Sequence, residues 1–254
     1  MGAGHSHPLY VHGHTRVHRL PPEVKLAATV AFVAGVALTP REAVWAFAVD
    51  ALTLVGAIAA ARLRPGFVAR RLLVILPFVA FAFVIPFVAS GEQVEVLGLA
   101  VSREGLWGSW NVLAKASLGA TASILLAATT EVPRLLAGMT RLRVPAVLTA
   151  IASFMVRYLE VIAGELGRMR IAMAARGYAP RWLWQARPIA TSAGALFVRS
   201  YERGERVHAA MLARGYTGAM PELDDRRATR SEWTVGAAMP LVSWGAATIA
   251  LVMV

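Results

Sequence analysis

The sequence contains no cysteine and few charged residues. None of its 254 residues is Cys, and only 16% are Asp, Glu, Lys or Arg. The absence of cysteine excludes a disulfide framework, a thiolate metal site and a cysteine nucleophile. A soluble domain carries about a quarter charged residues, and 57% of this chain is hydrophobic, so the composition predicts an integral membrane protein. Residues 1–20 also lack the apolar segment of a signal peptide, so we expect neither cleavage nor secretion.

Long apolar stretches with few charges account for the hydrophobic composition. They run over 26–40, 43–61, 72–90, 105–130 and 233–254. A helix needs about 20 apolar residues to cross a bilayer, and the first stretch is shorter than that. It depends on the flanking Lys25 and Arg41, whose charged ends can reach the membrane interface. We therefore expect an all-α membrane protein with about five transmembrane helices.

Composition divides the chain into four regions. Residues 1–25 are a His-containing N-terminal segment, and residues 26–130 are expected to form four transmembrane helices. Residues 131–232 are expected to form a cytoplasmic helical insert, and residues 233–254 are expected to form the last transmembrane helix. This pattern predicts a multi-pass protein of the cell inner (cytoplasmic) membrane.

The net charge of +11 lies mostly in the connections between the apolar stretches. Segment 1–25 has a net charge of +2, segment 62–71 has +4, and segment 131–232 has sixteen Arg against nine acidic residues. The connection 40–42 is neutral, and segment 90–107 has a net charge of −2. This alternation predicts that the N-terminus and the insert are cytoplasmic and that the C-terminus is outside. Because the charge follows membrane topology, we expect no nucleic-acid partner. The expected partner is the lipid bilayer.

The insert is predicted to contain one short helix and two long, crossed helices. The short helix begins at Glu131, and the long helices cover 145–176 and 188–214. Each long helix begins with a proline, which suits the first turn, and is followed by a glycine. The first half of each long helix is apolar but too short to span a bilayer, so we expect these halves to pack on each other and against the cytoplasmic ends of the membrane helices.

Both long helices end in nearly the same six letters, MAARGY at 173–178 and MLARGY at 211–216. A glycine cap and an arginine in the last turn are ordinary helix endings, and they explain Arg-Gly. An interaction site explains more: the alanines permit close approach, the methionines give adaptable apolar contact, and each arginine offers a rigid donor fork. The expected docking residues are Ala175, Arg176, Gly177, Ala213, Arg214 and Gly215, supported by Met173, Tyr178, Met211 and Tyr216. Two matching tips suit a partner with twofold symmetry, such as an ATPase dimer.

The repeat resembles the paired Ala-x-Arg-Gly motifs of the transmembrane T component of energy-coupling factor (ECF) transporters, most closely the cobalt-type CbiQ family. Two further segments are similar to that family, HRLPPEVKL at 18–26 and EVPRLLAGMTRLRVP at 131–145. The first departs from the family pattern at Pro21, where the family usually has Asp. The resemblance covers roughly residues 16–250.

This resemblance implies a non-catalytic coupling subunit. Arg176 and Arg214 would dock in grooves of two ABC-type ATPase subunits, which would bind ATP and Mg, so this chain needs no cofactor. The coupling helices would transmit ATPase closure to a substrate-binding membrane (S) subunit, and the complex could include a small accessory membrane subunit. Cobalt uptake feeding cobalamin synthesis is the expected role. One alternative is uptake of nickel or a vitamin. Another is a membrane-embedded enzyme that acts on a lipid through Asp224, Asp225 and the arginines, and a third is an autonomous ion channel or carrier.

The remaining candidate groups lack a defined geometry in the sequence. The N-terminal segment contains five candidate ligands for Ni²⁺, Co²⁺ or Zn²⁺, namely His5, His7, His12, His14 and His18. Asp50 and Lys115 are charges inside apolar stretches, where they could pair with each other or lie at a helix end or subunit interface. The chain has no phosphate-binding glycine loop and no paired acid and base motif, so no catalytic residue is expected.

Overall fold

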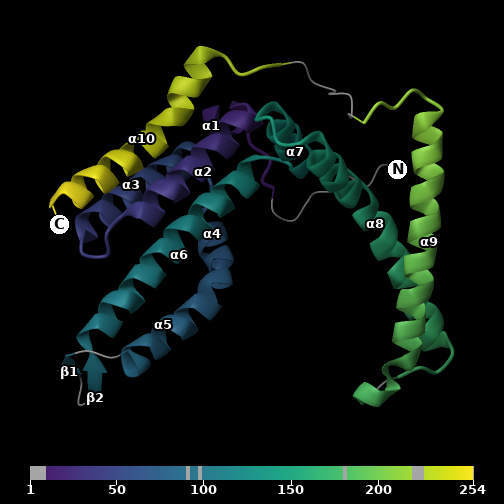
Figure 1. The fold of residues 1–254 in the computed structure, drawn as a ribbon, viewed down its shortest axis with the longest axis horizontal. Helices are drawn as coiled ribbons and strands as arrows, with labels where there is room; N and C mark the ends of the chain where they lie inside the picture. Colours follow the sequence, from purple (N-terminus) through teal and green to yellow (C-terminus); the bar gives the residue numbers. More distant parts are fainter. Residues whose placement is uncertain (1–9, 90–91, 97–98, 180–181, 219–225, 254) are drawn as a thin grey trace. The chain divides into compact units, whose positions relative to one another are not determined.

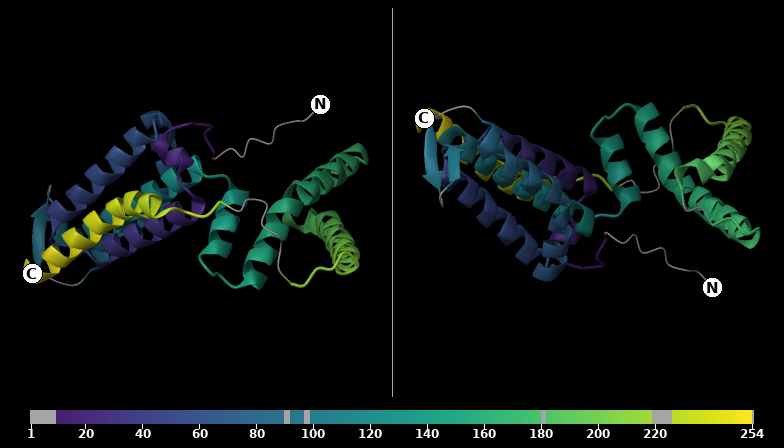
Figure 2. Two further views of the ribbon diagram at one scale, coloured as in Figure 1. Left: turned by 90° about the horizontal axis from the view of Figure 1, so that it is seen from above. Right: turned by 90° about the horizontal axis from the view of Figure 1, so that it is seen from below.

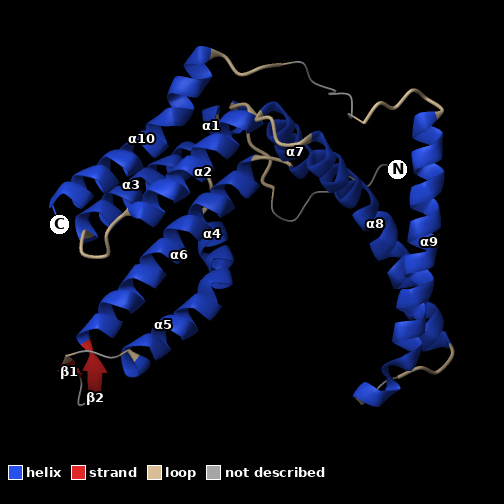
Figure 3. Cartoon of the chain, viewed as in Figure 1, coloured by secondary structure: helices blue, strands red, loops and turns tan. Residues whose placement is uncertain are grey.

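The computed structural model describes residues 10–89, 92–96, 99–179, 182–218 and 226–253. The chain forms two compact units, one of residues 1–142 with 226–254 and one of residues 143–225. Helices make up most of the described residues, and the strands among them form one short hairpin (Figure 3). The expected all-α architecture is therefore confirmed apart from this hairpin.

The first unit contains most of the apolar helices, and Figure 1 shows their order along the chain. Its helices are α1 (Arg16–Arg19), α2 (Pro22–Leu38), α3 (Val44–Ala60), α4 (Pro65–Arg71), α5 (Leu76–Val88), α6 (Arg103–Thr129), α7 (Val132–Arg141) and α10 (Arg230–Met253). A proline lies in the first turn of α2, α4 and α7, where its fixed φ favours the helix and its missing N–H costs no hydrogen bond.

Helix α2 is central to the packing of the first unit. It packs against α6, α7 and α10, and α10 also packs against α3. Figure 2 shows from two further directions that α10 runs beside α2. Phe32 and Val36 of α2, Phe47 of α3 and Leu118 of α6 belong to one buried apolar cluster. Helix α2 therefore joins several helices of the first unit in one core.

Four stretches of helix are long and apolar enough to cross a membrane, among the described residues. They are Pro65–Val88, Arg103–Thr129, Ala146–Ala175 and Arg230–Met253. Three of them coincide with apolar stretches expected to span. The fourth is α8, which meets the same criteria because its first half is apolar, although we expected it in the insert. The other two expected spans are α2 and α3, each of 17 residues, so the expected set of five is supported only in part.

A short hairpin precedes α6, in a segment expected to be a simple loop. Strands β1 (Gln93–Val96) and β2 (Leu99–Ser102) pair antiparallel, with Gln93 opposite Ser102. The residues of β1 alternate polar and apolar, with valine at every second position, which favours a strand. Ser102 then ends the hairpin and begins α6, because its hydroxyl accepts a hydrogen bond from Gly105 N (3.3 Å).

The second unit consists of two long helices joined by a short connection. Helix α8 covers Ala146–Ala175 and helix α9 covers Arg187–Leu212, with a 3₁₀ turn, Leu183–Ala186, before α9. Pro145 precedes the first residue of α8, and Pro188 lies in the first turn of α9, as the sequence predicted. The two helices pack against each other within this unit.

Candidate functional site

The end of α8 is capped by three backbone hydrogen bonds within its hexapeptide. Arg176 N donates to Met173 O (3.0 Å), Gly177 N donates to Ala174 O (3.0 Å), and Tyr178 N donates to Met173 O (3.1 Å). Gly177 has φ +77°, in the left-handed region that glycine adopts at little cost. This is a Schellman cap, which supplies partners for the last carbonyl groups of the helix.

The end of α9 repeats this cap bond for bond. Arg214 N donates to Met211 O (3.0 Å), Gly215 N donates to Leu212 O (3.0 Å), and Tyr216 N donates to Met211 O (3.0 Å). Gly215 has φ +82°. The two hexapeptides therefore form the same structural motif. A chance repetition of the sequence would not need to do so.

The cap also gives the methionines and tyrosines a structural role. In a Schellman cap the residue after the glycine frequently makes an apolar contact with the residue three positions before the cap residue, and these are tyrosine and methionine in both tips. The Tyr178 hydroxyl donates to Gln185 O, and the Ser192 hydroxyl donates to Met173 Sδ (3.5 Å), so the α8 tip is also joined to the start of α9. Helix capping thus accounts for more of the repeat than the sequence suggested.

Helix capping does not explain the alanines and arginines of the tips. Ala175, Arg176, Ala213 and Arg214 are all exposed. Neither arginine side chain forms a hydrogen bond or an ion pair with another described residue. An exposed guanidinium beside an exposed alanine presents its donors to whatever approaches the helix end.

The two tips lie at opposite ends of the second unit. The end of α8 contacts the start of α9 through Met173 and Ser192, whereas the start of α8 and the end of α9 line one cavity. The helices are therefore antiparallel, and the tips are separated by about one helix length, roughly 40 Å at 1.5 Å per residue. The expectation that the apolar first halves of the two helices pack on each other is wrong, because each first half lies beside the second half of the other helix. A single partner that contacts both tips must have two matching grooves about this far apart.

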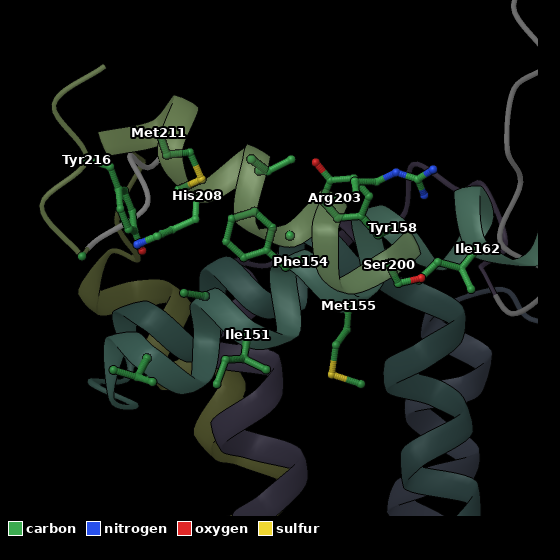
Figure 4. Close-up of a pocket in the computed structure, with 15 residues that line it drawn as sticks. Ile151, Phe154, Met155, Tyr158, Ile162, Ser200, Arg203, His208, Met211 and Tyr216 are labelled. Atoms are coloured by element: carbon green, nitrogen blue, oxygen red, sulfur yellow. The ribbon is translucent and has the colours of Figure 1, made fainter. Parts of the chain in front are cut away.

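The cavity between the helices has a volume of about 570 Å³ and an apolar lining. Figure 4 shows Ile151 and Phe154 of α8 on one side, and Met211 and Tyr216 of the α9 tip on the other. The same methionine and tyrosine that cap α9 thus also line the cavity beside the start of α8.

A buried glutamate joins α8 to α9 away from the tips. Glu165 of α8 is only 7% exposed, and its two carboxylate oxygens accept from Arg199 Nη1 (3.2 Å) and Arg203 Nη2 (3.3 Å) of α9. The arginines are four residues apart, on one face of α9, so both reach the same carboxylate. We call these three residues the α8–α9 clamp. The sequence analysis did not single them out.

The segment HRLPPEVKL at 18–26 packs inside the first unit through Lys25. Lys25 is buried and its Nζ donates to His18 O (3.1 Å), Thr129 O (2.9 Å) and Thr130 Oγ1 (3.2 Å). It therefore holds a positive charge against the last carbonyl of α6, where the helix dipole favours a cation. This corrects the expectation that Lys25 extends to the membrane interface, since its ammonium group is enclosed by protein.

The histidines do not form a recognisable metal site in the described part of the chain. No group of three or more His, Cys, Asp or Glu side chains that could hold a metal occurs there, and His5 and His7 lie outside it. His18 is buried, with Nδ1 bonded to the Thr15 hydroxyl (2.7 Å) and Nε2 to Val11 O (3.2 Å). Burial lowers the pKa of His18 and so favours its neutral ring. Both ring nitrogens thus already have protein partners.

Asp50 and Lys115 do not pair with each other. Lys115 Nζ donates to Ala37 O (2.8 Å), at the end of α2. Asp50 is fully buried in α3, and its two carboxylate oxygens have no hydrogen-bond partner among the described residues. Asp224 and Asp225, the acids expected of an enzyme, lie outside the described residues.

Comparison with known proteins gives one family. The family model described as "Cobalt transport protein", CbiQ, matches residues 13–223. The chain is similar to the cobalt transport protein CbiQ of Rhodobacter capsulatus, with 32% identity over 60% of this chain and 66% of the relative. It is also similar to the energy-coupling factor transporter transmembrane protein EcfT of Bacillus selenitireducens, with 29% identity over 82% of each chain.

Proposed function

The chain belongs to the CbiQ family of cobalt transport proteins, transmembrane components of ECF transporters, and we propose that it couples ATP hydrolysis on partner subunits to substrate uptake. The observation that carries this proposal is the pair of matching, exposed, arginine-bearing caps at opposite ends of one helical unit. A dimer of ABC-type ATPase subunits offers the same groove twice, so one chain can contact both subunits.

The tip arginines would act as the contacts with the ATPase. Arg176 and Arg214 each present a planar fork of donors that can bind carboxylates or carbonyl oxygens in the groove. Closure of the ATPase dimer on ATP would then move the two tips, and the α8–α9 clamp would make both helices move together. In this scheme ATP and Mg²⁺ bind the ATPase, and the present chain supplies no catalytic group.

In this proposal another subunit contacts the substrate. We propose a substrate-binding membrane (S) subunit, with a small accessory membrane subunit, and cobalt feeding cobalamin synthesis as the cargo. The support for cobalt is the family description and the name of the R. capsulatus relative. Nickel or a vitamin would require the same coupling residues in this chain.

We propose that the chain lies in the inner membrane of the cell, with its second unit in the cytoplasm. The N-terminus is then inside and the C-terminus outside. Arg103 and Arg170 are exposed in the first and second units, respectively. Since the chain has no native cysteine, Arg103→Cys and Arg170→Cys can be labelled singly with a membrane-impermeant maleimide. We expect external labelling of intact cells at position 103 only. External labelling at position 170 would overturn this topology.

Purification with candidate partners tests the proposed function. We expect an ABC-type ATPase to co-purify with the chain, and vesicles holding the complete complex to take up radioactive Co²⁺ only when ATP is present on the ATPase side. An excess of Ni²⁺ or of a vitamin serves as competitor and identifies the cargo. A chain that retains no ATPase, or uptake that proceeds equally without ATP, would contradict the proposal.

A further inference from the structure

One buried carboxylate contacts both chain segments that connect the two units. Glu23, at the start of α2, is 4% exposed. Its Oε2 accepts from Arg141 Nη1 (3.3 Å), and its Oε1 accepts from Ala228 N (3.1 Å). Arg141 Nη1 also donates to Arg226 O (2.6 Å), so the two segments are joined to each other as well. We call Glu23, Arg141, Arg226 and Ala228 the joint.

Three of these residues lie next to the boundaries of the second unit in the chain. The second unit begins at residue 143 and ends at residue 225. Arg141 is the last residue of α7, just before the second unit, and Arg226 and Ala228 follow directly after it. The chain therefore leaves the first unit and returns to it at one carboxylate, although these contacts span 118 and 205 residues of sequence.

The surroundings of Glu23 hold it firmly. The Arg141 and Glu23 side chains are only 11% and 5% exposed, so the ion pair is shielded from solvent. Helix α7 also approaches the backbone of α2 closely at Gly138, where an added Cβ would lie 2.9 Å from Glu23 N and 3.0 Å from Pro22 C. Two residues further along α2, Lys25 binds the end of α6. The start of α2 thus has defined contacts with α6, α7 and the segment before α10.

We propose that the joint is the mechanical connection through which movement of the second unit reaches the membrane helices, with Glu23 as a positioning residue for coupling. This inference rests on the proposed function, since it assigns a path to the movement that the ATPase would produce. A force on either end of the second unit reaches Arg141 or Ala228 first, and both are bonded to the start of α2. Because α2 packs against α6 and α10, displacement of its start shifts both helices.

An ion pair that only stabilises the fold would behave differently from a joint. Loss of a stabilising pair lowers the melting temperature but leaves the properly folded fraction fully coupled. Loss of a joint leaves a folded complex in which ATP is hydrolysed while the membrane helices do not respond. The experiment must therefore measure uptake per ATP hydrolysed, in purified complexes that contain the ATPase.

Three variants separate these cases in vesicles that hold the complete complex. Glu23→Ala removes both acceptors, and we expect uptake per ATP hydrolysed to fall about tenfold while the ATPase stays bound. Glu23→Gln keeps one oxygen acceptor without the charge, so we expect a fall of about threefold. Glu104→Ala is the matched control, because it removes only the exposed Arg41–Glu104 pair (2.9 Å) of the same unit, and we expect no change.

A distance measurement gives a readout that a purely stabilising role would not change. Spin labels at Arg64→Cys and Arg170→Cys, both exposed, report the separation of the two units in the complex. With the native Glu23 we expect a distribution that shifts on adding a non-hydrolysable ATP analogue. With Glu23→Ala we expect a broader distribution, because Arg141 and Ala228, next to the two ends of the second unit in the chain, are no longer bonded to the start of α2.

Each outcome of these experiments either supports the inference or overturns it. Unchanged uptake per ATP in Glu23→Ala overturns it, and so does a complex that no longer retains the ATPase. If Glu23→Ala does not accumulate in the membrane, Glu23→Gln decides alone, and full coupling in that variant overturns the inference. A native chain that never retains an ATPase refutes the proposed function instead, so the two failures are distinguishable.

Discussion

Replacing both tip arginines, as Arg176→Ala with Arg214→Ala, is expected to abolish retention of the ATPase while the chain remains folded in the membrane. Each arginine would make a partly desolvated, charge-assisted contact in its groove, and truncating such a contact costs about 2–5 kcal/mol. Loss of both contacts therefore weakens binding by at least about 4 kcal/mol, roughly a thousandfold in dissociation constant. Each single variant should give an intermediate loss.

The chain should fold without these side chains because the caps do not use them. Both helix ends are held by backbone hydrogen bonds and by glycine at positive φ, and both arginine side chains are exposed. Loss of the favourable charge at a helix end costs at most about 1 kcal/mol per site. Lysine at either position should restore little binding, since it keeps the charge and loses the planar fork.

The measurement is pull-down of the ATPase, scored against the amount of chain in the membrane. The matched control is Arg157→Ala with Arg206→Ala, which removes two exposed arginines of the same helices away from the tips. We expect the control to retain the ATPase. A double tip variant that assembles and transports like the native chain would show that the repeat is a pair of helix caps and nothing more.

The ends of the coupling helices were predictable from sequence because local chemistry determines them. Glycine after the last turn and proline in the first turn mark helix boundaries whatever the helix packs against. The same local rules did not reveal that the tyrosine and methionine of each hexapeptide belong to the cap. The structure adds this point through the Tyr178–Met173 and Tyr216–Met211 backbone hydrogen bonds.

The ionic contacts inside each unit were not predictable, because their partners are far apart in sequence. Glu165 meets Arg199 and Arg203 only where two helices cross, and Glu23 meets Arg141 only where α7 packs on α2. A signal existed for the first of these, since arginines four residues apart on α9 can share one acid of a neighbouring helix. The identity of that acid depends on the geometry of the helix crossing, and the periodicity of a sequence does not give this geometry.

Lys25 shows why an isolated-helix argument failed. A lysine at the end of a short apolar stretch is expected to extend toward the membrane surface, if the helix is considered alone. In the folded unit, the end of α6 lies beside it and offers an unpaired carbonyl at Thr129. The carbonyl needs a donor and the ammonium group needs acceptors, so each group satisfies the other when the two are buried side by side.

The second large effect is expected at the α8–α9 clamp. Glu165→Ala removes the acceptor of two arginines at once, while Arg203, whose side chain is only 32% exposed, loses its counter-charge. The two helices should then separate more easily, and the tips should lose their fixed spacing. We expect uptake per ATP hydrolysed to fall about tenfold, together with weaker retention of the ATPase, because the two grooves can no longer be occupied together.

Amide hydrogen exchange distinguishes this loss from a local effect on α8. In Glu165→Ala, amides on both α8 and α9 should exchange faster, although only α8 carries the substitution. The matched control is Glu202→Ala, which removes the exposed Glu202–Arg206 pair (3.7 Å) of α9 and should change neither exchange nor uptake. Glu165→Gln, which keeps the shape and one acceptor, should lie between the two.

Exchange also separates the clamp from the joint at Glu23. Glu23→Ala should uncouple the complex and leave exchange in α8 and α9 unchanged, because its contacts lie in the first unit. Glu165→Ala should uncouple it with faster exchange in both helices. If Glu165→Ala transports and exchanges as Glu202→Ala does, the crossing of α8 and α9 is held by apolar contacts alone, and the ionic clamp has no part in coupling.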